Sequence, residues 1–202
     1  MKKFFILLFF IFFTAQLCIA ANTEQFMITA FVPNITRLDI GAYTMAKNAP
    51  QTFNEINATQ ELNFGTLVYQ TDSEIYLPDK FFVVDVNIAS GTSGVATTVQ
   101  YTEGTAPAGQ VKTLGYKGKI NFAKVKNGVE FAIPGHAIKY FNEIKSGDTI
   151  NIAQGDGFLR LYIGIIDGSE TADLIPRGAE TFKSYDKAGT YTGTITVTAV
   201  AP

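Results

Sequence analysis

Near the end of the chain, residues 190–200 read TYTGTITVTAV. Every second residue from Thr190 to Thr198 is a threonine, and most of the positions between them are apolar. Alternate side chains of a β-strand point to opposite faces of its sheet. The segment therefore predicts a strand with a threonine face toward water and an apolar face, which includes Ile195 and Val197, toward a core.

The same alternation recurs along the chain, between clusters of Gly, Ser, Asp and Asn. The pair Asn127 and Gly128 is typical of a two-residue hairpin turn. Short helices are expected only within residues 42–57 and 137–144. Many short strands with frequent turns predict an all-β fold, an immunoglobulin-like antiparallel β-sandwich with short helical turns at most. The predicted strands lie within residues 38–42, 62–69, 82–88, 95–101, 119–125, 129–133, 149–153 and 159–165.

The composition restricts the class of protein. The chain has 202 residues, a formal net charge of −2, 47% hydrophobic residues and 17% charged residues. These values exclude a basic nucleic-acid binder and an acidic disordered chain, so we expect no nucleic-acid partner.

The first residues are typical of a secretory signal peptide. Lys2 and Lys3 precede an apolar run over residues 4–13, and small residues follow. The run is shorter than the roughly 20 apolar residues that a membrane-spanning helix needs. A lipoprotein signal would use Cys18, but the bulky Leu17 before it does not fit that pattern.

We therefore assign residues 1–20 to a signal peptide and expect export through the general secretory route, to the periplasm, the cell surface or a fimbrium. The only cysteine lies in this segment, so the mature chain is expected to fold without a disulfide. No later stretch predicts a membrane span in the mature chain. No Pro-, Ser- or charge-rich linker divides residues 34–202, which predicts one β-sandwich domain there.

Residues 21–33 form an N-terminal extension, and residues 26–32 within it read FMITAFV. Pro33 follows and ends strand pairing because it lacks an N–H group. This segment is a candidate donor strand that docks into an open sandwich edge, although it also fits the first strand of a self-contained sandwich. The residues on its docking face are Phe26, Ile28, Ala30 and Val32.

The sequence offers little for catalysis, and we predict no catalytic, cofactor or metal site. His136 is the only histidine and follows Gly135, so it is interpreted as a solvated turn residue rather than a catalytic base or zinc ligand. Ser90 and Ser93 lack the Gly-x-Ser-x-Gly pattern of a nucleophile elbow.

Two charged stretches have alternative interpretations. Acidic residues near 167–173 offer oxygen ligands for calcium, but their spacing is more typical of an acidic turn. The lysine-rich stretch favours either contact with an anionic surface or, more simply, protection of an edge hairpin against unwanted pairing. The acidic residues are Asp167, Glu170 and Asp173, and the lysines are Lys112, Lys117, Lys119, Lys124 and Lys126.

Two motifs resemble bacterial fimbrial subunits of the chaperone-usher pilin type and related secreted β-sandwich domains. Residues 187–198 read KAGTYTGTITVT, like the Ala-Gly-x-Tyr turn and final strand of those subunits. Residues 62–67 read LNFGTL, similar to their early Leu-x-Phe-Gly-Thr motif. The two motifs cover about a tenth of the chain.

This resemblance implies an incomplete sandwich that polymerises by strand donation, with copies of itself or related subunits as partners and an assembly chaperone. Phe26, Ile28, Ala30 and Val32 would then complete the neighbouring subunit. The function expected from it is a non-enzymatic structural subunit of a surface fibre or adhesive layer. The alternative is a monomeric secreted binding module that recognises a glycan or a protein through its loops.

Overall fold

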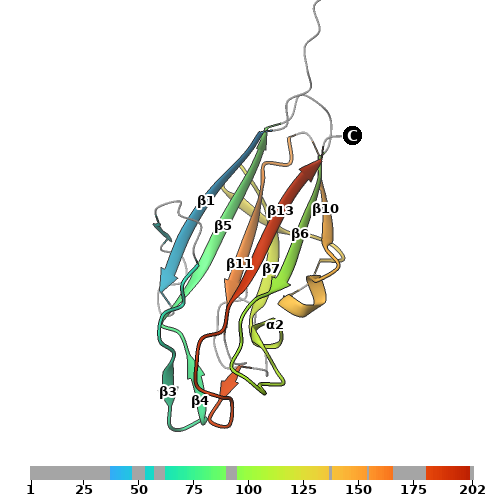
Figure 1. The fold of residues 1–202 in the computed structure, drawn as a ribbon. Helices are drawn as coiled ribbons and strands as arrows, with labels where there is room; N and C mark the ends of the chain where they lie inside the picture. The colour runs from blue at the N-terminus through green and yellow to red at the C-terminus, as the bar shows by residue number, and fades with distance from the viewer. Residues whose placement is uncertain are drawn as a thin grey trace, which may run out of the picture. The chain divides into compact units, whose positions relative to one another are not determined.

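Antiparallel strands make up most of the chain that the structure describes (Figure 1). The computed structural model describes residues 37–46, 53–56, 62–89, 95–136, 138–153, 155–165 and 181–200. The predicted signal peptide, the candidate donor strand at residues 26–32 and the acidic residues near 167–173 lie outside these ranges.

The described elements are mostly short strands. The strands are β1 (Arg37–Ala46), β2 (Phe53–Glu55), β3 (Val68–Gln70), β4 (Ile75–Leu77), β5 (Lys80–Ala89), β6 (Val95–Glu103), β7 (Lys119–Lys126), β8 (Val129–Ala132), β9 (Lys139–Tyr140), β10 (Asp148–Ile152), β11 (Phe158–Gly164), β12 (Phe182–Lys183) and β13 (Gly193–Val200). The helical segments are α2 (Leu114–Lys117) and a 3₁₀ turn, η1 (Phe141–Ile144).

These strands form three sheets. The large sheet has seven strands in the order β2-β1-β5-β11-β7-β8, with β9 also paired to β7. The small sheet has the order β10-β6-β13, and the end sheet has the order β12-β4-β3. Each described strand pair is antiparallel, which confirms the predicted all-β antiparallel class.

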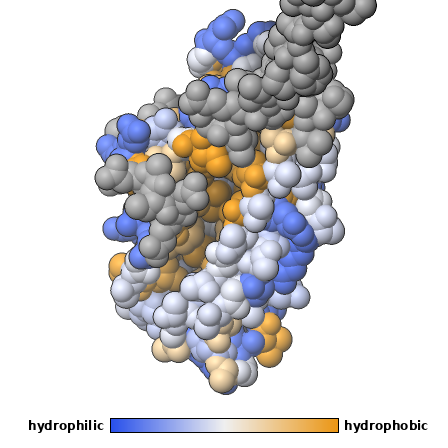
Figure 2. Space-filling view, turned by 45° about the horizontal axis from the view of Figure 1, so that its top comes forward, coloured by the Kyte–Doolittle hydropathy of each residue, from blue (hydrophilic) through white to orange (hydrophobic). Residues whose placement is uncertain are grey.

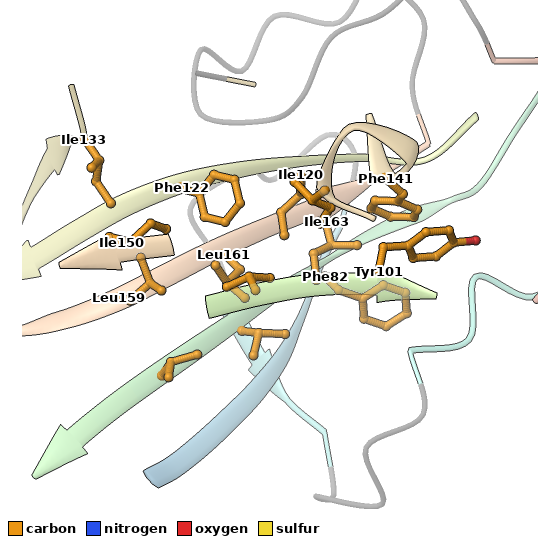
Figure 3. Packing of buried hydrophobic residues seen from close by; sticks show 14 of the residues in the cluster. Phe82, Tyr101, Ile120, Phe122, Ile133, Phe141, Ile150, Leu159, Leu161 and Ile163 are labelled. Atoms are coloured by element: carbon orange, nitrogen blue, oxygen red, sulfur yellow. The ribbon is translucent and has the colours of Figure 1, made fainter. Parts of the chain in front are cut away.

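The large and small sheets enclose the main core, which makes them the two layers of a sandwich. Side chains from β5, β7 and β11 point toward those from β6 and β10 (Figure 3). Phe82, Leu161 and Val99 are each at most 2% exposed. We call the side of the large sheet that faces the small sheet its inner face.

The opposite, outer face of the large sheet also carries buried apolar side chains. Val83 and Tyr162 are 0% and 1% exposed, although they alternate with inner-face residues. The apolar alternation of residues 82–88 and 159–165 is typical of strands with one buried face, but β5 and β11 are buried on both faces. The outer-face cluster comprises Met45, Phe81, Val83, Ala123 and Tyr162.

A charged network lies on the same outer face. The Arg160 guanidinium donates to both carboxylate oxygens of Asp85 at 2.6 and 2.7 Å and to Glu130 at 2.7 Å. It also lies 4.7 Å from the ring centre of Phe53. The hydrogen bonds to Asp85 raise the pKa of Arg160 above its ordinary value, so the guanidinium remains charged.

Neither predicted helical region forms an α-helix in its described part. Within residues 42–57, β1 continues to Ala46 and β2 covers Phe53–Glu55, because Tyr43 and Met45 pair with Val83 and Phe81 of β5. Within residues 137–144, strand β9 is followed by the 3₁₀ turn η1. The prediction of a short helical turn is therefore confirmed within residues 137–144, by η1, and is wrong for the described part of residues 42–57.

The predicted hairpin turn is confirmed at Asn127 and Gly128. Their φ angles are +53° and +76°, the left-handed values that a two-residue turn of this kind requires. The predicted strand at residues 62–69 is mostly wrong, because the ladder begins only at Val68.

Candidate functional site

The small sheet is much narrower than the large sheet that it covers. The small sheet has three strands side by side, whereas the large sheet has six, from β2 to β8, with β9 as an additional partner of β7. The last strand, β13, forms one of its edges and pairs with β6 alone among the described residues. The place beside β13 is therefore a candidate site for another strand.

The face pattern of β13 follows the sequence prediction. Thr194, Thr196 and Thr198 are exposed, whereas Ile195 and Val197 are partly buried against the main core. Their inward orientation is thus confirmed, but their burial is incomplete, unlike that of Val99 on the neighbouring strand β6.

Backbone hydrogen bonds show which groups of β13 remain for a partner. Thr192 accepts from the N–H of Gly104 at 3.0 Å and donates to the carbonyl of Thr105 at 2.9 Å. Residues of an antiparallel ladder alternate between those that bond to the partner and those that do not. The bonds to β6 thus continue at the even-numbered threonines, and the N–H and C=O groups of Ile195, Val197 and Ala199 point away from β6.

The inner face of the large sheet is incompletely covered at β1. Ile40 is 37% exposed, although Val86, directly opposite it on β5, is 0% exposed. Paired residues share a face, so Ile40 lies on the inner face beyond the edge of the small sheet. Figure 2 shows hydrophobic side chains gathered in a hollow on this side of the molecule.

Side chains outside the regular strands cover the start of β5. Phe64 packs edge-on against Phe82, with ring centroids 4.9 Å apart. Leu62 and Ile56 also pack, partly buried, against the main core. The uncovered surface is therefore concentrated between β13 and the first part of β1.

We call this feature the open slot, defined by the edge of β13 with which no described strand pairs and by the side chains of Ile40, Ile195 and Val197. It offers backbone hydrogen-bond donors and acceptors beside an apolar face. These are the groups that bind an extended segment with apolar residues at alternate positions.

A buried ion pair holds the chain that leads into β13. Lys117 of α2 lies 2.7 Å from Asp186, and the two side chains are 1% and 6% exposed. Asp186 also accepts from the backbone N–H of Lys183 at 2.8 Å and from Gln110 at 2.7 Å. A few residues later, Tyr191 stacks edge-on against Phe182 of β12. These contacts position the start of the open slot.

Opposing effects act on the pKa of Asp186. Burial raises the pKa of this carboxyl, but hydrogen bonds from Lys117, the Lys183 backbone and Gln110 outweigh burial and leave it below the ordinary value. The Asp186 carboxylate is therefore ionised, and its contacts hold the β12–β13 connection.

The predicted donor residues do not fall within the described chain, so the structure leaves that prediction open. The sequence did not identify the acceptor residues on β13 and β1. No residue pattern in the sequence shows that a strand lies at the edge of its sheet without a second neighbour. Only the sheet order reveals it.

Other predicted site residues have structural roles or lie outside the described chain. Lys117 is buried and Lys124 lies 2.6 Å from Asp156. Lys119, Lys124 and Lys126 lie on β7, which pairs with β11 and with the edge strand β8. These three lysines therefore belong to the hairpin at the edge of the large sheet, but not to its outermost strand. Ser90 and Ser93 fall outside the described ranges, as do the acidic residues near 167–173.

His136 closes a turn, as the sequence predicted, because its N–H donates to the carbonyl of Ile133 at 3.0 Å, but its side chain is not freely solvated. Its side chain is 20% exposed, and its Nδ1 lies 3.0 Å from Asp148 Oδ1. Lys139 Nζ lies 2.7 Å from the other oxygen of the same carboxylate. His136 followed Gly135 in the sequence and could not be linked there to a carboxylate on a distant strand.

The part of the chain that the structure describes shows neither a metal site nor a membrane-spanning helix. There, no three His, Cys, Asp or Glu side chains come together in a way that could hold a metal ion. Within the same ranges, no helix has the length and apolar character needed to cross a membrane.

Comparison of the chain with models of known protein families, with curated proteins and with solved structures finds no match in any of the three.

Proposed function

We propose that this protein is a non-enzymatic structural subunit of a surface fibre or adhesive layer, and that its copies join by strand addition. Residues 26–32 of one copy add to β13 of the next copy and complete its small sheet. The observation that carries the proposal is the free edge of β13 beside the uncovered inner face at Ile40. An apolar strand edge left open invites pairing with another chain.

The proposed donor matches the open slot in length and pattern. Residues 26–32 would extend over about 23 Å at the usual rise per strand residue, and β13 has 8 residues. Every second donor residue is apolar, so Phe26, Ile28, Ala30 and Val32 point into the slot together. The backbone then supplies binding energy, and these side chains supply specificity.

The N-terminal signal pattern supports an exported location for this assembly. Before assembly, the open slot would present an apolar edge to every other protein in the same compartment. A dedicated chaperone that occupies β13 during transport fits this requirement. The proposed partners are therefore other copies of the chain, or related subunits, and an assembly chaperone.

Paired substitutions in the donor strand test the proposal. Ile28→Ala removes a side chain that faces the slot, and Thr29→Ala changes the neighbouring residue on the opposite face. Burial of an Ile side chain contributes about 1.5–3 kcal/mol, so Ile28→Ala should weaken assembly by about tenfold to a hundredfold. Thr29→Ala should change it by less than about threefold. Sedimentation velocity of the mature chain across a concentration series measures both.

Two results would contradict the proposal. One is a mature chain that stays monomeric at every concentration and unfolds when residues 21–33 are deleted. That result would mean that the extension completes its own sandwich, and it would favour a monomeric secreted binding module for a glycan or a protein. The other is an equal effect of Ile28→Ala and Thr29→Ala, because a strand in the slot must distinguish its two faces.

A further inference from the structure

The end sheet exposes a group of large apolar side chains. Val68 and Tyr69 on β3 are 55% and 41% exposed, and Tyr185 after β12 is 76% exposed. The strand β3 is itself an edge, paired with β4 alone among the described residues. Val68 and Tyr69 are neighbours in β3, so they project from opposite faces of the end sheet. Large apolar side chains exposed at one small sheet are typical of a surface that is covered in an assembly.

The end sheet lies where β13 begins. Its strand β4 ends at Leu77, just before β5 starts at Lys80, and β1 ends beside that position. Tyr191 precedes β13 and stacks against Phe182 of the end sheet. Figure 1 shows β3 and β4 at this end, with the start of β1 at the opposite end.

The connection between the donor strand and its own domain is short. Residues 33–36 separate the proposed donor strand from Arg37, where β1 begins. An extended chain spans at most about 18 Å between residues 32 and 37. A copy that donates its strand must therefore place the start of its β1 against one end of the domain that receives the strand.

The direction of the donor strand decides which end is covered. All described strand pairs of this domain are antiparallel, and antiparallel pairing is slightly more stable per residue than parallel pairing. A guest strand antiparallel to β13 ends beside Gly193, next to the end sheet. We infer that the end sheet, where Tyr69 and Tyr185 are exposed, is the seat for the domain of the donating copy, at the end where its β1 begins.

This inference rests on the proposed function and adds a second contact between copies, separate from the open slot. Tyr69→Ser with Tyr185→Ser should weaken assembly of the mature chain at least tenfold. The same chain, kept monomeric by dilution, should bind a labelled synthetic peptide of residues 21–33 with an affinity within twofold of the unsubstituted chain. The peptide has a donor strand but no domain, so it needs only the slot.

A matched control uses Val129→Ser with Phe131→Ser on β8. These side chains are 53% and 51% exposed, comparable to Val68 and Tyr69, but they lie on an edge of the large sheet. This pair should change assembly by less than twofold. Circular dichroism checks that each variant folds. If the double variant Tyr69→Ser with Tyr185→Ser does not fold, the single variant Tyr185→Ser replaces it in the assembly and peptide-binding measurements.

The outcomes separate the two proposals. If the peptide binds and the end-sheet variant assembles normally, the inference is overturned and strand addition stands. If the β8 variant is the impaired one, the donating domain sits elsewhere and the inference is again overturned. If the end-sheet variant also loses the peptide, these residues act on the slot and not on a second contact. If the unsubstituted chain neither binds the peptide nor assembles, the proposed function itself fails.

Discussion

Replacing Val197 with proline is expected to abolish assembly while the domain stays folded. The N–H of Val197 points away from β6, toward the place that the donor strand would occupy. Proline removes this donor and puts a ring in its place, at a position where an edge strand tolerates it. The donor-strand carbonyl left without its partner costs about 1–3 kcal/mol, and the proline ring also blocks the close approach of that strand, so assembly should weaken by about a hundredfold or more.

The control for this variant is Val197→Ala, which shortens the side chain but keeps the N–H group. It should retain measurable assembly, weakened by about tenfold, because part of an apolar contact is lost. Sedimentation velocity measures assembly, and urea unfolding confirms that both variants remain folded. A Val197→Pro chain that assembles as well as Val197→Ala would show that the backbone edge of β13 does not receive a strand.

The sequence predicted the parts of the fold that follow a simple period. The threonine alternation gave the orientation of β13, and Asn127 with Gly128 gave the β7–β8 turn, because both signals depend on neighbouring residues. The strand class and the absence of long helices followed from the same local patterns. These predictions needed no knowledge of which strands pair.

Features that depend on distant partners could not be predicted. Lys117 resembled a surface lysine among other lysines, yet its partner Asp186 lies 69 positions later in the chain. Val83 and Tyr162 alternate with core residues, and only the layers around the large sheet show that both faces are buried. The vacancy beside β13 is likewise a property of sheet order, since the pattern of Ile195 and Val197 is the same on a covered strand.

The buried ion pair is expected to have the largest effect on the stability of the domain. Asp186→Ala leaves the ammonium group of Lys117 at 1% exposure without its carboxylate. Removal of one partner from a buried pair costs about 3–5 kcal/mol, because the remaining charge stays desolvated. Lys117→Met should cost a similar amount. Urea unfolding, at protein concentrations below those of assembly, measures both free energies of unfolding.

The double variant Lys117→Met with Asp186→Leu tests whether charge or position matters. It removes both charges and should be more stable than either single variant, since apolar replacement of a whole buried pair is often neutral. If it is as unstable as the sum of the single variants, the pair contributes through independent contacts. Asp186 would then act mainly through the Lys183 backbone and Gln110.

The pH dependence of the free energy of unfolding, compared between the unsubstituted chain and Asp186→Ala, gives an independent test. Because the pKa of Asp186 is lowered in the folded state, its contribution is present above the unfolded pKa of about 4 and is lost as pH falls through the lower folded value. The stability difference between the unsubstituted chain and Asp186→Ala should therefore be constant near neutral pH and narrow in acid. A constant difference down to low pH would show that Asp186 does not stabilise this connection as a carboxylate. The start of β13 would then be held by the packing of Tyr191 on Phe182, and the open slot would keep its shape in acid.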